Sequence, residues 1–151
     1  MGNDNKLVLL VEDNVDDERL TLRALHKNNI MNEVVVACDG QDALDYLFAR
    51  GKHEGRDRAV MPALVILDLA LPKLHGLEVL REIRAHEDTA LLPVVVLTST
   101  DDDKQVADSI RMGANSFIRK PVDAAEYSDM ILQVGMYWLL LNHAPPVAKR
   151  A

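Results

Sequence analysis

Three acidic side chains, two hydroxyls and one lysine occupy equivalent places in the sequence, because each follows or closes a short run of apolar residues. They are Glu12, Asp13, Asp68, Thr98, Ser99 and Lys120. Carboxylates that share a small volume repel one another unless a cation offsets the repulsion. Mg²⁺ prefers oxygen ligands and accepts one or two carboxylates, so these acids predict a Mg²⁺ site if the fold brings them together.

Each of these residues by itself has an ordinary structural explanation. An acidic pair after a strand usually caps a helix or lies in a solvated loop, and a pair such as Lys120-Pro121 usually forms a turn. The combination is informative, because all of them lie at the carboxyl ends of apolar runs. No ionisable residue falls inside the strand-like runs after Glu33.

The elements that must position these side chains alternate between short β-branched runs and longer amphipathic stretches, which is the pattern of βα units. Asp16 or Asp17 is expected to cap the first helix. Strands are predicted at 6–11, 33–37, 64–67, 93–97 and 116–118. Helices are predicted at 16–27, 41–50, 74–85, 101–112 and 124–142, with an exposed loop at 51–62. The fold class is therefore α/β, with a doubly wound, five-stranded parallel sheet and five helices.

A flavodoxin-like strand order of 2-1-3-4-5 gives this sheet a point at which the direction of strand addition reverses. Right-handed crossovers place all the carboxyl ends of the strands along one edge, and ligands bind outside that edge at the reversal point. This order sets the first strand beside the third. Glu12 and Asp13 would then lie next to Asp68.

Composition limits the classes of protein that fit. The chain has 151 residues, 17 Lys and Arg against 24 Asp and Glu, and a net charge of −7, so nucleic-acid binding is disfavoured. Cys38 is the only cysteine, which excludes a disulfide framework and a cysteine-based zinc site. No leader is recognisable, and the apolar stretch at 134–141 is too short to span a bilayer. A single cytoplasmic domain without a membrane segment is expected.

Together these motifs resemble the receiver domain of two-component response regulators. The matching segments are the acidic pair in LLVEDN, the aspartate in LVILDLALP, the hydroxyl in VVVLTS and the lysine in SFIRKP. Thr98 lies 30 residues after Asp68, and Lys120 lies 52 residues after it, as the family pattern requires. The resemblance covers residues 6–141. The rest of the chain is expected to be a short disordered tail containing Pro145-Pro146.

The resemblance implies a role for each matching residue. Asp68 would be the nucleophile that takes a phosphoryl group from a histidine kinase. Asp13 and Asp68 would bind Mg²⁺ directly, with the Ala70 carbonyl as a third ligand and Glu12 acting through water. Lys120 would supply a positive charge. The Thr98 hydroxyl would bind a phosphoryl oxygen and draw its loop inward.

Three further positions follow from the same resemblance. Phe117 is either the aromatic residue that turns inward when the hydroxyl moves or simply a core residue of a short strand. The Lys120–Pro121 bond is cis in the family and would aim the lysine into the site. Ala70 stands where relatives often carry a polar side chain that orients or blocks water, so the lifetime of the phosphoryl group is not transferable from relatives.

The end of the receiver pattern near Leu141 leaves ten residues, too few for an output domain, so a stand-alone receiver that acts through protein contacts is expected. The last predicted helix has more apolar residues than one packing face needs. The surplus indicates either a homodimer or partner surface, or cover by the tail itself. The segment DLALPKLHG and the Tyr137-Trp138 pair resemble small regulators paired with bacterial phytochrome-type histidine kinases, which commonly dimerise through this helix.

Other classes fit the sequence less well. A haloacid dehalogenase-type enzyme needs its nucleophile after the first strand and a second aspartate two residues later, but Asp13 is followed by Asn14-Val15. No glycine-rich nucleotide loop occurs, and the five histidines lack ligand-like spacing. A scaffold of the same fold that has lost phosphorylation stays open, although the complete set of site residues argues against it. Beryllofluoride binding would indicate a receiver, and turnover of a generic phosphate ester would indicate a hydrolase.

Overall fold

The computed structural model describes residues 7–27, 33–72, 74–99 and 102–141, without the side chain of Leu141. The expected strand start at Lys6, the helix start at Asp101, the helix end at Asn142 and the tail after it lie outside the described residues.

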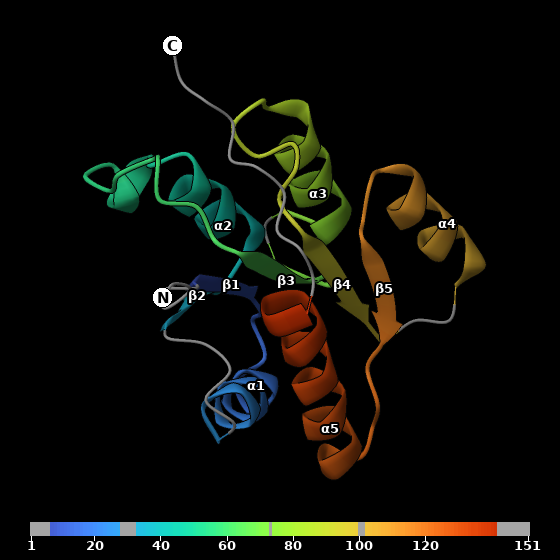
Figure 1. The fold of residues 1–151 in the computed structure, drawn as a ribbon. Helices are drawn as coiled ribbons and strands as arrows, with labels where there is room; N and C mark the ends of the chain where they lie inside the picture. Colours follow the sequence, from blue (N-terminus) through green and yellow to red (C-terminus); the bar gives the residue numbers. More distant parts are fainter. Residues whose placement is uncertain (1–6, 28–32, 73, 100–101, 142–151) are drawn as a thin grey trace.

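Five parallel strands form one sheet in the order β2-β1-β3-β4-β5, which confirms the predicted order (Figure 1). Their bounds are β1 Leu7–Val11, β2 Glu33–Ala37, β3 Leu64–Asp68, β4 Val94–Thr98 and β5 Ser116–Arg119. Every residue of β1, β3 and β4 is buried, because helices cover both faces of the sheet. Three strands end one residue later than predicted, β3 at Asp68, β4 at Thr98 and β5 at Arg119.

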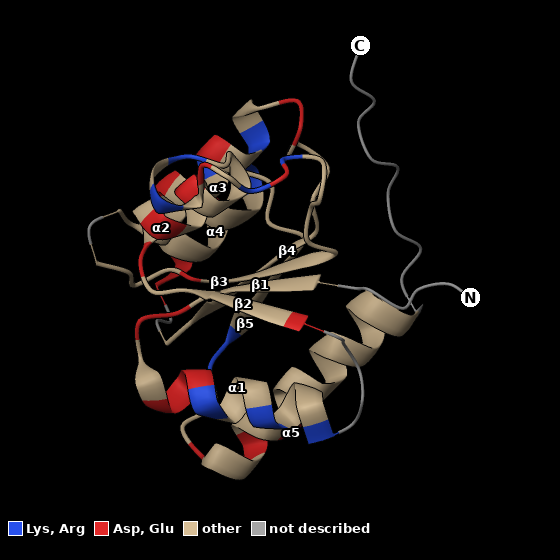
Figure 2. Cartoon of the chain, turned by 90° about the vertical axis from the view of Figure 1, so that its left-hand side faces the viewer, with Lys and Arg blue, Asp and Glu red and all other residues tan. Residues whose placement is uncertain are grey.

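The helices form a layer on each face of the sheet. Figures 1 and 2 show α1 and α5 on one face and α2, α3 and α4 on the other. The bounds are α1 Val15–Lys27, α2 Gly40–Leu47, α3 Gly76–Ala85, α4 Asp103–Arg111 and α5 Ala124–Gly135. A short 3₁₀ helix, η1, spans Gly51–His53 within the predicted loop, and a π-helical segment, η2, spans Met136–Leu141. Two separate apolar clusters fill the spaces between the sheet and its two helix layers.

The cap of α1 differs from the prediction. The side chain of Asn14, rather than that of Asp16 or Asp17, accepts a hydrogen bond at the start of the helix, from the backbone N–H of Asp17 at 2.9 Å. An asparagine is as good an N-cap as an aspartate. Because Asn14 caps the helix, the carboxylate of Asp17 is free for another contact.

The start of α3 lies against the end of β3. A Cβ atom added to Gly76 would come within 2.7 Å of the carbonyl oxygen of Asp68 and within 2.6 Å of the Cα atom of Leu69. The backbone N–H of Gly76 also donates to the carbonyl of Leu69 at 3.0 Å. Glycine is therefore required here for close approach, and this approach fixes the backbone that carries Asp68.

The end of the last helix also differs from the prediction. A regular helix to residue 142 was expected. In the structure α5 stops at Gly135 and η2 follows; Leu139 is fully buried, whereas Trp138 is only partly buried. A π-helical turn holds more residues than an α-helical turn. The buried side chain one turn after Val134 is therefore five residues later, at Leu139, instead of four residues later, at Trp138.

This change of register makes a testable distinction between neighbouring leucines. Leu139→Ala is expected to lower the free energy of unfolding by about 2–4 kcal/mol, because it leaves a cavity in the apolar cluster between the sheet and the layer of α1 and α5. Leu140→Ala is the matched control, because Leu140 is 55% exposed and its truncation should cost under about 0.5 kcal/mol. Urea denaturation measures both. Equal costs, or a greater cost at Leu140, would contradict the π-helical register.

No helix within the described ranges is both long enough and apolar enough to cross a membrane.

Candidate functional site

Three carboxylates meet at the carboxyl edge of the sheet, where β1 and β3 are neighbours. Glu12 and Asp13 follow β1, and Asp68 ends β3; ligand oxygens from the three side chains lie within 4.8 Å of one another. Glu12 and Asp68 are buried, and Asp13 is exposed. Figure 2 shows Asp and Glu positions along this edge, between the two helix layers. The predicted juxtaposition is present, with one carboxylate facing solvent, from which an ion can enter.

The ammonium group of Lys120 lies among these acids. Its Nζ atom donates to Asp68 Oδ2 at 2.8 Å, to Asp17 Oδ2 at 2.9 Å and to Glu12 Oε1 at 3.0 Å. The side chain of Lys120 is only 11% exposed. Hydrogen bonds between charged groups in such a poorly solvated place are strong, so Lys120 is the cation that offsets the carboxylate repulsion in this structure.

Backbone N–H groups bind the second carboxylate oxygens of Glu12 and Asp68. The N–H of Ala70 donates to Asp68 Oδ1 at 3.1 Å, and the N–H of Asn14 donates to Glu12 Oε2 at 3.2 Å. Asp68 therefore has one oxygen on the backbone and the other on Lys120. This arrangement fixes the direction in which the Asp68 carboxylate points.

The surroundings of Glu12 shift the pKa of its carboxyl group. Burial, with a smaller contribution from the hydrogen bond to Asp68 and the charge of Asp68, raises the pKa of the Glu12 carboxyl from its usual value of 4.5 to about 8, while Lys120 partly opposes the rise. Glu12 therefore holds a proton near neutral pH when Lys120 is the only cation present. A divalent cation would favour the ionised form and release this proton.

Lys120 responds in the opposite sense. Burial alone would lower the pKa of its ammonium group, but hydrogen bonds to Asp68 and Asp17 and the charges of Asp68 and Glu12 raise this pKa well above its usual value. Lys120 is consequently charged throughout the physiological range. The site always contains one fixed positive charge.

Thr98 and Phe117 lie on adjoining strands beside this cluster. Asp68 pairs in register with Leu97, so Thr98 is one residue beyond it on β4. The next strand places Phe117 opposite Val96 and Arg119 opposite Thr98. Thr98 is buried, and Phe117 is partly buried against the apolar cluster under α2 and α3. The alternation of side chains along a strand puts Thr98 and Phe117 on the same face of the sheet.

The expected cis bond before Pro121 is not found: no cis peptide bond occurs among the described residues, and the cis expectation is wrong in this structure. The N–H of Lys120 donates to the carbonyl of Thr98 at 2.7 Å, which fixes the backbone that enters this trans bond. From that position the lysine side chain reaches all three acids. The trans form is also the isomer that X–Pro bonds favour, by about 0.5–1 kcal/mol.

Asp17 is the site residue that the sequence interpretation missed. It was expected only as a possible helix cap, yet its carboxylate is a direct partner of Lys120. One signal was available, because Asp17 is an acidic residue in the first turn of the helix that directly follows the Glu12-Asp13 pair. Its partner was not predictable, since Lys120 is 103 residues further along the chain.

Comparison with known proteins agrees with this geometry. The model of the response regulator receiver domain matches residues 8–132. Response regulator Rcp1 from Synechocystis sp. is 35% identical over 138 residues, which are 91% of this chain and 92% of the relative. The crystal structure of the Mn²⁺-bound form of Rcp1 has a TM-score of 0.86 at 34% identity, covering 93% of this chain and 99% of the other.

Two further solved structures are similar. The phosphorylated cyanobacterial phytochrome response regulator RcpA has a TM-score of 0.87 at 33% identity, and the match covers 94% of this chain and 99% of RcpA. The bacteriophytochrome response regulator AtBRR is 43% identical with a TM-score of 0.71, and the match covers 93% of this chain and all of AtBRR.

The chain belongs to the response regulator receiver family, the phospho-accepting class of protein in two-component signalling. Its similarity to phytochrome response regulators extends over nearly the whole chain. Receiver domains bind a divalent metal at an acidic pocket, and the cluster of Glu12, Asp13 and Asp68 fits that description.

Proposed function

We propose that Asp68 accepts a phosphoryl group from a phosphohistidine on a partner kinase. An Asp68 oxygen attacks phosphorus, the new P–O bond forms as the P–N bond breaks, and the imidazole leaves with the electron pair of that bond and takes up a proton. The observation that carries the proposal is the position of Asp68. It ends β3 at the carboxyl edge, with Lys120 Nζ at 2.8 Å and two further carboxylates close by.

The donor set favours Mg²⁺ as the metal of this site. All the side chains that supply ligand atoms are carboxylates, and hard oxygen donors suit Mg²⁺. Asp13 and Asp68 would hold it, with the carbonyl of Ala70 as a third protein ligand and Glu12 acting through water. When bound, Mg²⁺ would neutralise charge on the oxygens of the entering phosphoryl group.

Mg²⁺ affinity is expected to depend on pH, because Glu12 must lose its proton to favour the ion. Since the pKa of Glu12 is about 8 without metal, affinity should fall as the pH drops below 8, by up to about tenfold per pH unit. Isothermal titration calorimetry at pH 6 to 9, in buffers of different ionisation enthalpy, measures both affinity and proton release. Glu12→Gln should abolish the proton release; a pH-independent affinity in the unaltered protein would contradict the account.

The side chains of Thr98 and Phe117 would convert phosphorylation into a change of the protein surface. The Thr98 hydroxyl would bind a phosphoryl oxygen, and Phe117, which shares its face of the sheet, would respond by turning inward. The small side chain of Ala70 leaves space beside the acceptor for water, so we propose that the chain also catalyses its own dephosphorylation. Pro121 would hold Lys120 at the turn after β5.

A histidine kinase of the phytochrome type is the proposed partner. The support is the similarity over nearly the whole chain to RcpA and AtBRR, both described as phytochrome response regulators. Such a kinase makes its phosphohistidine from ATP, which fits a cytoplasmic location. The chain would act as one receiver domain over 1–151, within which residues 8–132 match the family.

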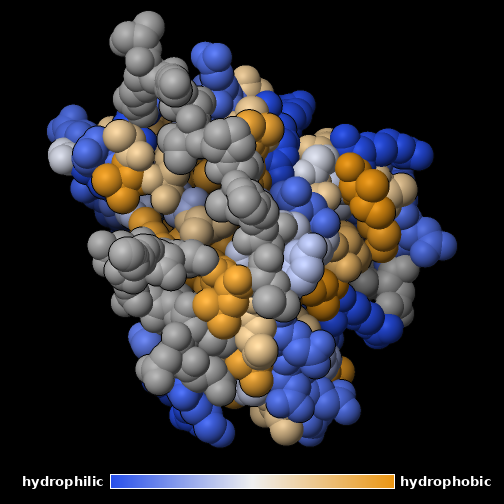
Figure 3. Space-filling view, viewed as in Figure 1, coloured by the Kyte–Doolittle hydropathy of each residue, from blue (hydrophilic) through white to orange (hydrophobic). Residues whose placement is uncertain are grey.

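The proposed output surface is the end of the last helix, acting as a homodimer contact. Met136, Tyr137 and Leu140 are 44%, 50% and 55% exposed, although all three are apolar or aromatic. Figure 3 shows hydrophobic side chains gathered on this face around the end of α5. Exposed apolar surface of this kind is typical of a protein contact. A monomeric mass at micromolar concentration, with and without beryllofluoride, would contradict the dimer.

Phosphotransfer from purified kinases tests the proposed function. Histidine kinases from the same genome, labelled with radioactive ATP, are mixed with the chain, and the transfer of label is followed over seconds to minutes. A phytochrome-type kinase should transfer fastest. Absence of transfer from every kinase, combined with absence of labelling by acetyl phosphate, would instead support a scaffold that has lost phosphorylation.

A further inference from the structure

Lys120 has three carboxylate partners, and they are not equivalent. Two of them, Glu12 and Asp68, belong to the acidic cluster that fits a divalent cation. Asp17 does not belong to that cluster, although its Oδ2 atom is 2.9 Å from Lys120 Nζ. A cation that engages Glu12 and Asp68 weakens their contacts with the lysine. Asp17 is then the partner for which the metal does not compete.

Asp17 is held firmly enough to fix the lysine. Its backbone N–H donates to Asn14 Oδ1 at 2.9 Å, and its carbonyl accepts the hydroxyl of Thr21 at 2.8 Å. Thr21 Oγ1 is in turn 3.2 Å from the hydroxyl of Tyr127 on α5, and both of these residues are buried. Burial raises the pKa of Tyr127 to about 12, so its hydroxyl stays protonated and polar. Asp17 is thus anchored in the packed contact of α1 with α5.

We infer that Asp17 is a positioning residue for Lys120, which holds the ammonium group beside the acceptor and competes with the incoming phosphoryl group for it. The inference rests on the proposed role of Asp68 as acceptor. Lys120 must exchange at least one carboxylate for a phosphoryl oxygen when Asp68 is phosphorylated. Because Asp17 is outside the metal cluster, its hold on Lys120 opposes that exchange and limits how tightly the site retains the phosphoryl group.

Replacing Asp17 with asparagine tests this inference, since the two side chains have the same shape but only one is charged. With beryllofluoride and saturating Mg²⁺ as a phosphoryl mimic, D17N is expected to bind about three- to tenfold more tightly, because Lys120 is released to the mimic. The bound mimic is measured directly by ¹⁹F NMR. The matched control is Asp16→Asn, which removes the same charge from an exposed neighbour and should change the affinity by less than about twofold.

A double-mutant cycle separates positioning from a simple charge effect. If Asp17 acts through Lys120, D17N should have no effect in a Lys120→Met background; a direct repulsion between Asp17 and the mimic would persist there. Asp17→Glu, which retains the charge, should restore most of the unaltered affinity. Equal affinities for D17N, D16N and the unaltered protein would overturn the inference. Failure of the unaltered protein to bind the mimic would instead overturn the proposed function of Asp68.

Discussion

Replacing Asp68 with asparagine is expected to lower phosphoryl incorporation from acetyl phosphate or a cognate kinase by at least about 100-fold. The asparagine amide has no anionic oxygen with which to attack phosphorus, and no neighbouring acid can take its place. Glu12 is turned toward Lys120 and the backbone N–H of Asn14, and Asp13 is exposed at the edge of the cluster. Labelling with radioactive phosphodonor, followed by gel separation, measures the loss.

The D68N variant should remain folded, which makes the loss interpretable. Asparagine has the shape of aspartate and can still accept the N–H of Ala70, and Lys120 keeps its contacts with Glu12 and Asp17. Asp16→Asn is the control, because Asp16 is exposed and lies outside the set of carboxylates that contact Lys120 in this structure. It should label as the unaltered protein does. Undiminished labelling of D68N would remove Asp68 as the acceptor.

Replacing Lys120 with alanine is expected to have the largest effect on folding. The three carboxylates that contact Nζ lose their common cation. Removing one partner of a buried charge pair typically costs about 3–5 kcal/mol, and a cost of this order is expected in the free energy of unfolding with EDTA present. The cost should be smaller at pH 6 than at pH 8.5, because a protonated Glu12 no longer repels Asp68.

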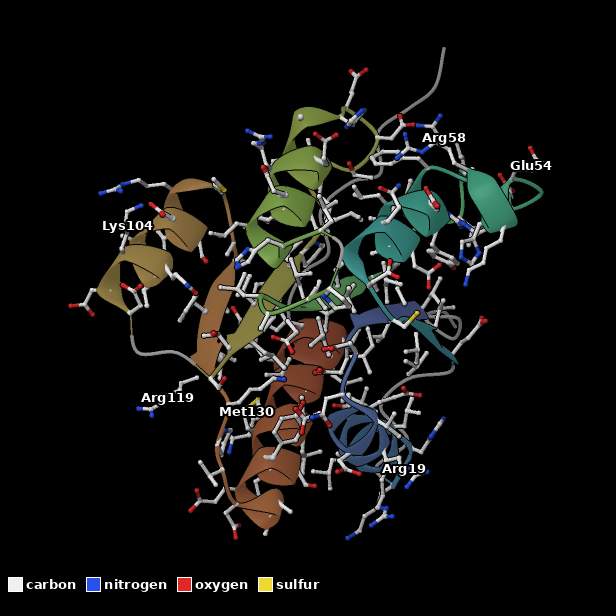
Figure 4. The ribbon with its side chains drawn as sticks, turned by 180° about the vertical axis from the view of Figure 1, so that it is seen from behind. Arg19, Glu54, Arg58, Lys104, Arg119 and Met130 are labelled. Carbon is white, nitrogen blue, oxygen red and sulfur yellow. The ribbon has the colours of Figure 1, made fainter. Side chains whose placement is uncertain are left out.

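Mg²⁺ distinguishes this electrostatic cost from lost packing. If Lys120 serves as the resident cation, about 10 mM Mg²⁺ should restore much of the stability of K120A, because the ion binds the same carboxylates. The same Mg²⁺ concentration should add less stability to the unaltered protein. Lys104→Ala is the matched control; Lys104 is exposed on α4, as Figure 4 shows, and its pair with Asp108 is worth under about 0.5 kcal/mol. Urea denaturation of the three proteins, with and without Mg²⁺, measures all six values. A destabilised K120A that does not respond to Mg²⁺ would contradict the account.

Strand positions and sheet order were predictable because they depend on local patterns. The continuous apolar runs of β1, β3 and β4 identify strands covered on both faces, and the alternation with helices leaves few topologies. The strand ends were less accurate. Asp68 and Thr98 are polar and were placed just after their strands, whereas pairing with Leu97 and Arg119 on neighbouring strands keeps them inside β3 and β4.

Contacts between distant segments account for the features that were not predicted. The π-helical turn after Gly135 places Leu139 in the core, and this choice depends on packing against the sheet rather than on helix propensity. The role of Asp17 depends on a lysine at the other end of the chain and on Asn14 taking over the helix cap.

The family resemblance identified the main site residues, and the structure adds how they are balanced. Glu12, Asp13, Asp68 and Lys120 meet at one edge of the sheet, as the strand order requires. A sequence pattern does not show that Glu12 holds a proton near neutral pH, because its pKa depends on burial and on its distance from Asp68. Nor does it show that one lysine serves three carboxylates.

Mapping the phosphorylated residue tests the central claim most directly. The chain is phosphorylated with acetyl phosphate and Mg²⁺ and reduced with borohydride, which converts an aspartyl phosphate to homoserine and leaves free carboxylates unchanged. Peptide mass spectrometry then locates the homoserine. The account predicts homoserine at position 68 and at no other aspartate; homoserine at Asp13 or Asp17, or its absence from a protein that carries the phosphoryl group, would contradict it.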